Sequence, residues 1–427
     1  MAWFRKLMGV VSGSVQFGVS IFLYQQQGEV LMSVTVIVSR SAYDCLESNG
    51  QLFECLADRE LVYVFSVRAS NLPPKGSYKE LHLIELRDAE EQLTQLLKSI
   101  QCRYDIEQVV YVSEQEVIPV AYAQQALGLS NLTVKKAQNF RDKPRMNGLA
   151  ELAGIEVNPI YQGSSLEELS TFIERYGKVV LKPTAEAGSV GVHMLTEAAL
   201  AFEMYDPETM LIQAYNPNDL YHLDALVRDN QLVFSSLGQY SVPCADYATE
   251  KWKASLISNQ ATALHATATA ALMRYLSAAD VQNGVFHFEF FSDGDNLTLC
   301  EIAIRPGGGG IAQAIDNVHG INLFDEHIRW QLGLPAACKN KTNQTYYTAT
   351  MSYFNKESGR FTKLDLASLS EQVNSIKYMS KIGQSVQTAR NGSDELFYLL
   401  LNNQSSYHQL LQTVDEIIDN AEVNINH

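Results

Sequence analysis

Hydrophobic and polar positions alternate along the first third of the chain in blocks that predict β-strands separated by helices. Four runs rich in β-branched and aromatic residues are typical of strands: "VTVIVS", "LVYVFSV", "ELHLIEL" and "QVVYVS". Two longer stretches predict helices: "AEEQLTQLLKSI" and "VIPVAYAQQAL". Because strands alternate with helices, residues 32–135 are predicted to form one small α/β domain.

A later block, "GVFHFEFFSDGDNLTLCEIAIRPGGGG" (284–310), predicts two strands joined by a turn at 292–296. In such a hairpin Glu289 faces Glu301 on one side of the sheet. Opposed carboxylates are destabilising unless a cation lies between them, and Mg²⁺ is bound by one or two carboxylates together with phosphate oxygens and water. Arg305 on the same face favours this site over its alternative, an exposed edge hairpin.

The second strand of this hairpin also makes a prediction about burial. Strict alternation places its residues on two faces, with Leu299, Glu301, Ala303 and Arg305 on one and Cys300, Ile302 and Ile304 on the other.

Composition and charge narrow the classes of function. The chain has 427 residues, of which 46% are hydrophobic and 19% charged, enough for a large core in two to four domains. A net charge of −16 and a pI near 5.0 argue against a sequence-independent nucleic-acid binder, which needs clustered Lys and Arg. The six cysteines form neither a CxxC pair nor a zinc pattern, as expected of reduced thiols in a cytoplasmic protein.

The first 31 residues resemble a signal peptide only in part. A moderately apolar run follows Arg5 and Lys6, but it lacks an A-x-A cleavage site and contains Ser, Gly and Gln, which make it a poor membrane span. Met32 stands directly before the first strand. We therefore expect the folded domain to begin at Met32, with residues 1–31 as an extension and no membrane association.

Three segments between these blocks contain groups suited to a nucleotide. In "KVVLKPTAEAGSVGVHML" (178–195), Lys182 ends a strand before a small-residue loop that could hold a polyphosphate, and a second strand is expected from Val190 or Gly191. Lys143 stands at the start of a helix-compatible run, and "LIQAY" (211–215) could offer backbone groups and an aromatic wall to an adenine. The alternatives are a flexible hairpin turn, a solvated lysine and a plain strand end. The segment is not a P-loop, because the lysine precedes the glycines.

Taken in order, five motifs resemble the ATP-grasp superfamily, in particular its carboxylate–amine ligase branch with L-amino-acid (dipeptide) ligases: "RDK", "VVLKP…AGSVGV", "LIQAY…YHLDALV", "HFEFF" and "CEIAIRPGGGG". The resemblance runs from about residue 32 to the C-terminus. It implies an ATP-grasp fold of the α/β and α+β classes, with a biotin-carboxylase-like architecture. The parts would be a Rossmann-like α/β domain at 32–135, an ATP-grasp core at 136–340 with a lid at about 180–240, and a small α+β domain at 341–427.

The resemblance implies an ATP-dependent ligase that activates a small carboxylate, in the first place an amino acid, as an acyl phosphate and joins it to an amine. ATP would be the co-substrate and Mg²⁺ the metal, with Mn²⁺ as an alternative ion, and related enzymes are often homodimers. The implied residues are Lys143, Lys182, Glu186, Gly188, Ser189, Gly191, Gln213, Tyr215 and His222 for ATP, Glu289 and Glu301 for the metal, Arg305 for the acyl phosphate, and Gly308 and Gly309 for the substrate.

Three positions depart from the family pattern. Gln213 stands where an acidic residue is common, Leu220 falls where a ribose-binding glutamate often lies, and Ala303 replaces an asparagine that frequently completes the metal site. We expect phosphate oxygens and water to complete the metal coordination in place of a ligand at residue 303.

Two other functions compete with the ligase. One is a biotin-carboxylase-like or formyl-phosphate-type enzyme, which would show bicarbonate- or formate-dependent ATP consumption. The other is a non-catalytic ATP-binding protein, in which Glu301→Gln would leave ATP consumption unchanged. The loop 241–256 is a candidate for selecting the substrate through Tyr247, Trp252 or Lys253, against the alternative of a plain surface loop.

Overall fold

The computed structural model describes residues 31–40, 43–69, 71–129, 132–244, 249–294, 296–338 and 345–426. Apart from Leu31, the N-terminal extension expected at 1–31 lies outside these residues, as do Tyr247 and Asp295 of the predicted loop and turn. Within the described ranges, no helix combines the length and the apolar character needed to cross a bilayer.

The first sheet is fully parallel and has helices on both faces. Its strand order is β5-β4-β1-β6, with β1 at Ser33–Ser39, β4 at Leu61–Ser66, β5 at Glu80–Ile84 and β6 at Asp105–Tyr111. Alternate residues of β1 pack against α2 (Glu90–Gln101) and α3 (Val117–Leu127) on one face. On the other face, Ile37 shares a core with Ile328 of α10 (Leu323–Gln331). Burial on both faces explains the near-continuous apolar runs that predicted these strands.

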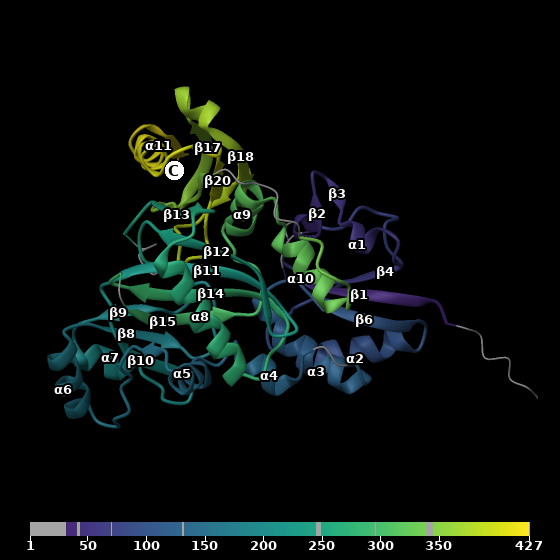
Figure 1. The fold of residues 1–427 in the computed structure, drawn as a ribbon, viewed down its shortest axis with the longest axis horizontal. Helices are drawn as coiled ribbons and strands as arrows, with labels where there is room; N and C mark the ends of the chain where they lie inside the picture. The colour runs from purple at the N-terminus through teal and green to yellow at the C-terminus, as the bar shows by residue number, and fades with distance from the viewer. Residues whose placement is uncertain are drawn as a thin grey trace, which may run out of the picture.

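The largest sheet has nine strands and runs through most of the molecule (Figure 1). Its neighbouring strands are antiparallel except for β7, which pairs in parallel with β15. In spatial order the strands are β18 (Val373–Tyr378), β20 (Phe397–Leu401), β16 (Tyr347–Tyr353), β13 (Trp252–Ser258), β12 (Gln231–Tyr240), β11 (Asp219–Arg228), β14 (Gly284–Ser292), β15 (Leu297–Ala303) and β7 (Glu156–Val157).

Helices cover both faces of this sheet around β11, β14 and β15. On one face, α5 (Lys143–Leu152) and α8 (Ala263–Ala278) share a core with Phe286, Phe288 and Phe290 of β14. On the other face, α9 (Ile311–His319) packs against Val285. The three phenylalanines of β14 therefore lie on the same buried face, as the alternation of a regular strand requires.

The alternation predicted for β15 was wrong at two positions. The β14–β15 ladder shifts register between Glu289 and Phe290, so that Glu289 pairs with Glu301 and Phe290 with Leu299, which leaves Cys300 as an extra residue. Such a bulge changes the face of every residue beyond it. Leu299 is consequently buried in the core, whereas Cys300 lies beside Glu301 on a cavity wall.

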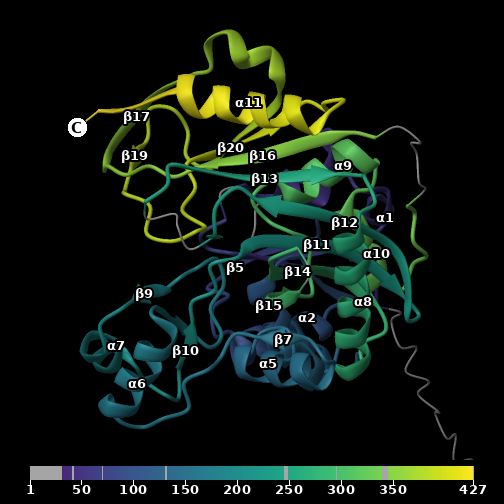
Figure 2. The same cartoon turned by 60° about the vertical axis from the view of Figure 1, so that its left-hand side comes forward.

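Two smaller sheets lie at opposite ends of the large one (Figures 1 and 2). The first has strand order β10-β8-β9 and packs with α6 and α7 in a core of its own: β8 Val179–Pro183, β9 His193–Leu195, β10 Met210–Ala214, α6 Leu166–Tyr176 and α7 Ala198–Met204. The second packs under α11, with β17 Gly359–Asp365, β19 Ser385–Val386, β21 Glu422–Asn426 and α11 Tyr407–Asn420. The second strand of the predicted phosphate hairpin begins at His193, later than expected.

The last part of the chain also supplies three strands to the nine-stranded sheet, since β16 pairs with β13 and continues the ladder to β20 and β18. The domain limits at 135 and 340 stay predictions. The remaining short elements are β2 (Glu47–Ser48), β3 (Gln51–Leu52), α1 (Glu54–Ala57) and α4 (Val134–Gln138), together with 3₁₀ turns at Tyr43–Leu46, Glu114–Glu116 and Ala367–Gln372.

We expect Phe288→Ala to lower the free energy of unfolding by about 3–5 kcal/mol, because it leaves a cavity between the large sheet and its helices. Phe288 is fully buried, whereas Leu152 at the end of α5 is 82% exposed. Urea denaturation of both alanine variants tests this, with Leu152→Ala expected within about 0.5 kcal/mol of the wild type. Equal losses in the two variants would contradict this account of the core.

Candidate active site

Two cavities meet at the β14–β15 hairpin. The larger one, of about 290 Å³, extends toward the C-terminal strands, and the smaller one, of about 120 Å³, lies against β8 and β10. Four residues line both cavities: Ser189, Cys244, Glu289 and Glu301. The two predicted metal ligands therefore stand where the cavities join.

Glu289 and Glu301 are directly paired across the two strands, as the sequence predicted. The Oε1 atom of Glu301 lies 3.2 Å from Nζ of Lys143, at the start of α5. The Oε1 atom of Glu289 accepts a hydrogen bond of 2.7 Å from the hydroxyl of Tyr240 and lies 3.3 Å from Nε2 of His287. Among the described residues, the contacts of both carboxylates are made by Oε1, which leaves Oε2 of each available as a ligand.

A buried chain of polar groups supports Glu289 from behind. Asp224 lies between two histidines, at 2.9 Å from Nδ1 of His287 and 2.7 Å from Nδ1 of His222, whose Nε2 reaches the hydroxyl of Ser255. Burial alone would lower the pKa of His287, but Asp224 and Glu289 outweigh it and raise this pKa to about 9. Burial likewise favours a raised pKa for Glu289, yet His287 and Tyr240 hold it at about 2. His287 thus carries a positive charge beside an ionised glutamate.

A second charge cluster lies at one side of the larger cavity. Glu114, which follows β6, accepts hydrogen bonds of 3.0 and 2.8 Å from Nε and Nη2 of Arg305, and it also pairs with Arg141. Burial favours a raised pKa for Glu114, but the two arginines outweigh it and lower this pKa to about 2. Two arginines against one glutamate leave a net positive charge beside the β14–β15 hairpin.

The smaller cavity contains most of the predicted ATP-binding residues. Its polar lining includes Lys143, Lys182, Glu186, Ser189, Gln213 and Tyr215. Its apolar lining includes Val180, Val192, Met194, Leu220 and Phe291. Burial is the largest effect on Lys182 and lowers the pKa of its ammonium. The cavity thus combines two lysines with several apolar side chains, groups that suit a phosphate chain attached to a flat ring.

The loop between β8 and β9 covers the junction of the cavities. Ser189 lines both cavities, and its hydroxyl donates a hydrogen bond of 3.3 Å to the carbonyl of Cys244. The carbonyl of Gly188 accepts a hydrogen bond of 2.9 Å from the amide of Gly392, on the C-terminal part of the chain. These two hydrogen bonds therefore hold the loop to two other parts of the wall of the larger cavity, at Cys244 and at Gly392.

Of the other predicted ATP-binding residues, Gly188 lines only the larger cavity, and two line neither. His222 is fully buried between Asp224 and Ser255 and lines neither cavity, so the expectation that it lies near a ribose is corrected. Gly191 is absent from both cavity walls and instead approaches Pro183, where a Cβ would come within 3.0 Å of the proline ring. Gly308 and Gly309 both line the larger cavity, as predicted for substrate-binding residues.

Several site residues were not identified from the sequence. His287 shares the alternating face of Glu289, so that pattern could have indicated it. Glu114 follows the carboxyl end of a parallel strand, the edge at which α/β sheets place their ligands. Asp224 and Cys244 carried no signal in the sequence. Lys253 was a candidate and lines the larger cavity, whereas Trp252 is buried in the C-terminal core.

Known proteins resemble this chain both in sequence and in fold. No protein-family model matches the chain. The L-arginine-specific L-amino acid ligase of Bacillus subtilis is 22% identical over 330 residues, which cover 72% of this chain and 78% of that relative. The solved structure of an L-amino acid ligase from Bacillus licheniformis superposes with a TM-score of 0.74 at 15% identity, covering 93% of this chain and all of that one.

A biotin carboxylase domain from Hydrogenobacter thermophilus, solved with MgADP and bicarbonate, superposes with a TM-score of 0.65 at 12% identity, covering 93% of this chain and 91% of that one. The fold is therefore that of ATP-grasp proteins. In sequence, the chain is similar to an amino acid ligase over most of its length.

The depressed pKa of Glu114 predicts a specific dependence of stability on pH. Relative to its ordinary value of 4.5, a folded-state pKa of about 2 stabilises the protein above about pH 4.5, and this contribution is lost as the pH falls toward 2. Between pH 6 and pH 3, the wild type should lose about 2 kcal/mol more than Glu114→Gln. Urea denaturation at both pH values measures the difference. The exposed Glu416 of α11 provides a control, since Glu416→Gln should keep the wild-type pH dependence.

Proposed function

We propose that this ligase activates the carboxylate of an amino acid with ATP and joins it to an amine. ATP would occupy the smaller cavity, with its phosphates on Lys143 and Lys182 and its adenine between the apolar walls near Tyr215. The carboxylate and the amine would occupy the larger cavity. One observation carries the proposal: the two cavities meet at Glu289 and Glu301, so that a γ-phosphate and a carboxylate can be held on either side of the same two side chains.

The two glutamates suit Mg²⁺. Both supply carboxylate oxygen. The Oε1 atom of Glu301 is buried with no hydrogen bond besides its ion pair with Lys143, and the Oε2 atom of each residue makes no contact with a polar group of the described residues. Ala303, which pairs with His287, offers no oxygen ligand, so phosphate oxygens and water would complete an octahedral shell. When bound, Mg²⁺ would neutralise charge on the phosphates. Mn²⁺ as an alternative ion, a homodimer and a cytoplasmic location stay predictions.

The residues of the site fit the two steps of such a reaction. In the first, a carboxylate oxygen bonds to the γ-phosphorus while the bond to the β–γ bridging oxygen breaks, which releases ADP. Lys143 and Lys182 would hold the phosphates in line, and Arg305 would offset the negative charge of the acyl phosphate. In the second step, the amine nitrogen bonds to the acyl carbon, phosphate leaves, and the nitrogen loses a proton. Positioning and charge suffice for both steps, with no covalent nucleophile on the protein.

A panel of amino acids with ATP and Mg²⁺ tests this function. We expect release of ADP and phosphate that depends on at least one amino acid, with a new amide identified by its mass. Each amino acid should be assayed alone and in pairs, and bicarbonate and formate should be included as competing substrates. ATP consumption that responds to bicarbonate or formate but to no amino acid would favour the carboxylase-like alternative.

Glu301→Gln keeps the size of the side chain and removes its charge. We expect kcat for ADP release to fall by at least about 100-fold. The reason is that Mg²⁺ would lose a charged ligand and would neutralise the phosphates less well during phosphoryl transfer. Where the variant retains activity, the Mg²⁺ concentration that gives half of its maximal rate should be higher than for the wild type. Glu416→Gln, on the exposed face of α11, should stay within about twofold of the wild type. If Glu301→Gln binds ATP and consumes it at the wild-type rate, Glu301 does not have this catalytic role.

A further inference from the structure

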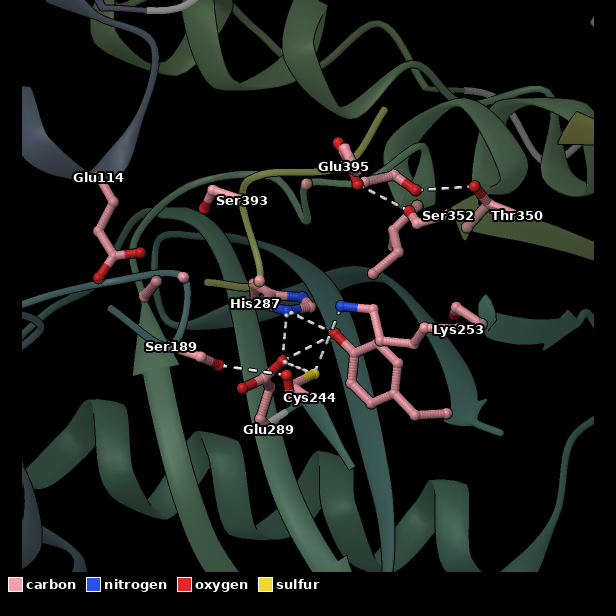
Figure 3. Close-up of a pocket in the computed structure, with 18 of the residues that line it drawn as sticks. Glu114, Ser189, Cys244, Lys253, His287, Glu289, Thr350, Ser352, Ser393 and Glu395 are labelled. Atoms are coloured by element: carbon pink, nitrogen blue, oxygen red, sulfur yellow. Dashed lines mark hydrogen bonds and ion pairs between the residues drawn. The ribbon is translucent and has the colours of Figure 1, made fainter. Parts of the chain in front are cut away.

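Glu395 and Lys253 bring opposite charges to the wall of the larger cavity. Lys253 lies in β13, Ser352 pairs with it from the neighbouring β16, and Glu395 comes just before β20 on the far side of β16. The Oε2 atom of Glu395 accepts a hydrogen bond of 2.7 Å from the hydroxyl of Ser352. Figure 3 shows Glu395 and Ser352 together at one side of the cavity, away from Glu114.

Four acidic residues line this cavity, and three of them have a cationic partner. Glu114 pairs with Arg305, Glu289 with His287, and Glu301 with Lys143. No ion pair joins Glu395 to a cation within the part of the chain that the structure describes; its hydrogen-bond partner is the neutral hydroxyl of Ser352. Glu395 is thus the one of these four acids that has no cation at contact distance among the described residues.

Lys253 does not neutralise Glu395 at contact distance. Its Nζ atom lies 3.8 Å from Sγ of Cys244 and 5.5 Å from the centre of the Tyr240 ring, on the side toward the metal-binding hairpin. The face of an aromatic ring stabilises an ammonium group but has no net charge, so the lysine keeps its positive charge. Burial is the largest effect on Glu395 and raises its pKa, with Ser352 and Lys253 acting in the opposite direction.

A carboxylate that is removed from water without a cation is unfavourable, and a ligand that carries a positive charge relieves that cost. The glycine run that follows Arg305 reaches the same place, since a Cβ at Gly309 would lie 3.7 Å from Oε2 of Glu395. A substrate that lies along Gly308 and Gly309 therefore has Arg305 at one end and Glu395 at the other. An anionic group suits the first end and a cationic group the second.

We propose that Glu395 binds the positively charged nitrogen group of a substrate, an alkylammonium or a guanidinium. The proposal rests on the proposed function, because it concerns the substrate cavity of the same ligase. Two parts of an amino acid could supply this group: the α-ammonium that all amino acids share, or the side chain of a basic one. Both would form a charge-assisted hydrogen bond with Oε1 or Oε2 of Glu395.

Glu395→Gln tests the proposal, because the amide retains the shape and can still accept the Ser352 hydrogen bond while the charge is lost. For amino acids that the wild type uses, KM for the amino acid should rise at least about tenfold and KM for ATP should change less than twofold. Glu395→Asp keeps the charge and should restore most of the affinity. Glu416→Gln is the matched control and should leave both KM values unchanged.

A comparison of substrates separates the two sources of the cation. If the α-ammonium binds, Glu395→Gln should weaken alanine and lysine alike, and the wild-type preference for an amino acid over the corresponding 2-hydroxy acid should fall to about one. If the basic side chain binds, only lysine, ornithine or arginine should weaken. Unchanged KM values for all of them in an active Glu395→Gln enzyme would overturn the proposal and leave the ligase function standing.

Calorimetry distinguishes failure of the inference from failure of the proposed function. Alanine and lysine would be titrated into the full chain with MgADP present, for the wild type and Glu395→Gln. A loss of affinity of at least about tenfold in the variant supports the cation site even if the amino-acid panel shows no turnover. Equal affinities, or no binding of either amino acid to the wild type, would overturn it.

Discussion

The repulsion between Glu289 and Glu301 is the constraint on which the rest of the site depends. Two carboxylates paired across strands of a largely buried sheet cannot remain ionised without nearby positive charge. The protein supplies this charge from three directions: Lys143 from α5, His287 from the same strand, and the arginines that share Glu114. A bound metal ion and the phosphate chain of a nucleotide would then complete the balance of charge at the junction of the cavities.

The buried chain of polar groups behind Glu289 shows how polar side chains, which are unfavourable in a core, can be stabilised there. Asp224 is fully buried, and its carboxylate is divided between His222, His287 and the amide of Gly307. Every member therefore has partners, which is the condition under which such a network fixes one geometry. Because Gly307 takes part, the glycine run after Arg305 and strand β14 are positioned by the same carboxylate.

Much of the fold and of the site could be predicted because its signals are local. Alternation on β14 placed Glu289 opposite Glu301, and the order of motifs predicted the ATP-grasp fold. The bulge at Cys300 could not be predicted, since one extra residue leaves the apolar pattern almost unchanged yet reverses the faces of Leu299 and Cys300. Glu395 could not be found either, because it lies far from the other cavity residues in the chain and only tertiary packing brings it to them.

The fastening of the β8–β9 loop links the two cavities mechanically. Ser189 belongs to both walls, and the hydrogen bond between Gly188 and Gly392 ties the loop to the segment just before Glu395. A displacement of this loop that widens access to the smaller cavity must also move part of the wall of the larger one. The shapes of the two cavities are therefore coupled through this loop, and neither can be altered at Ser189 without altering the other.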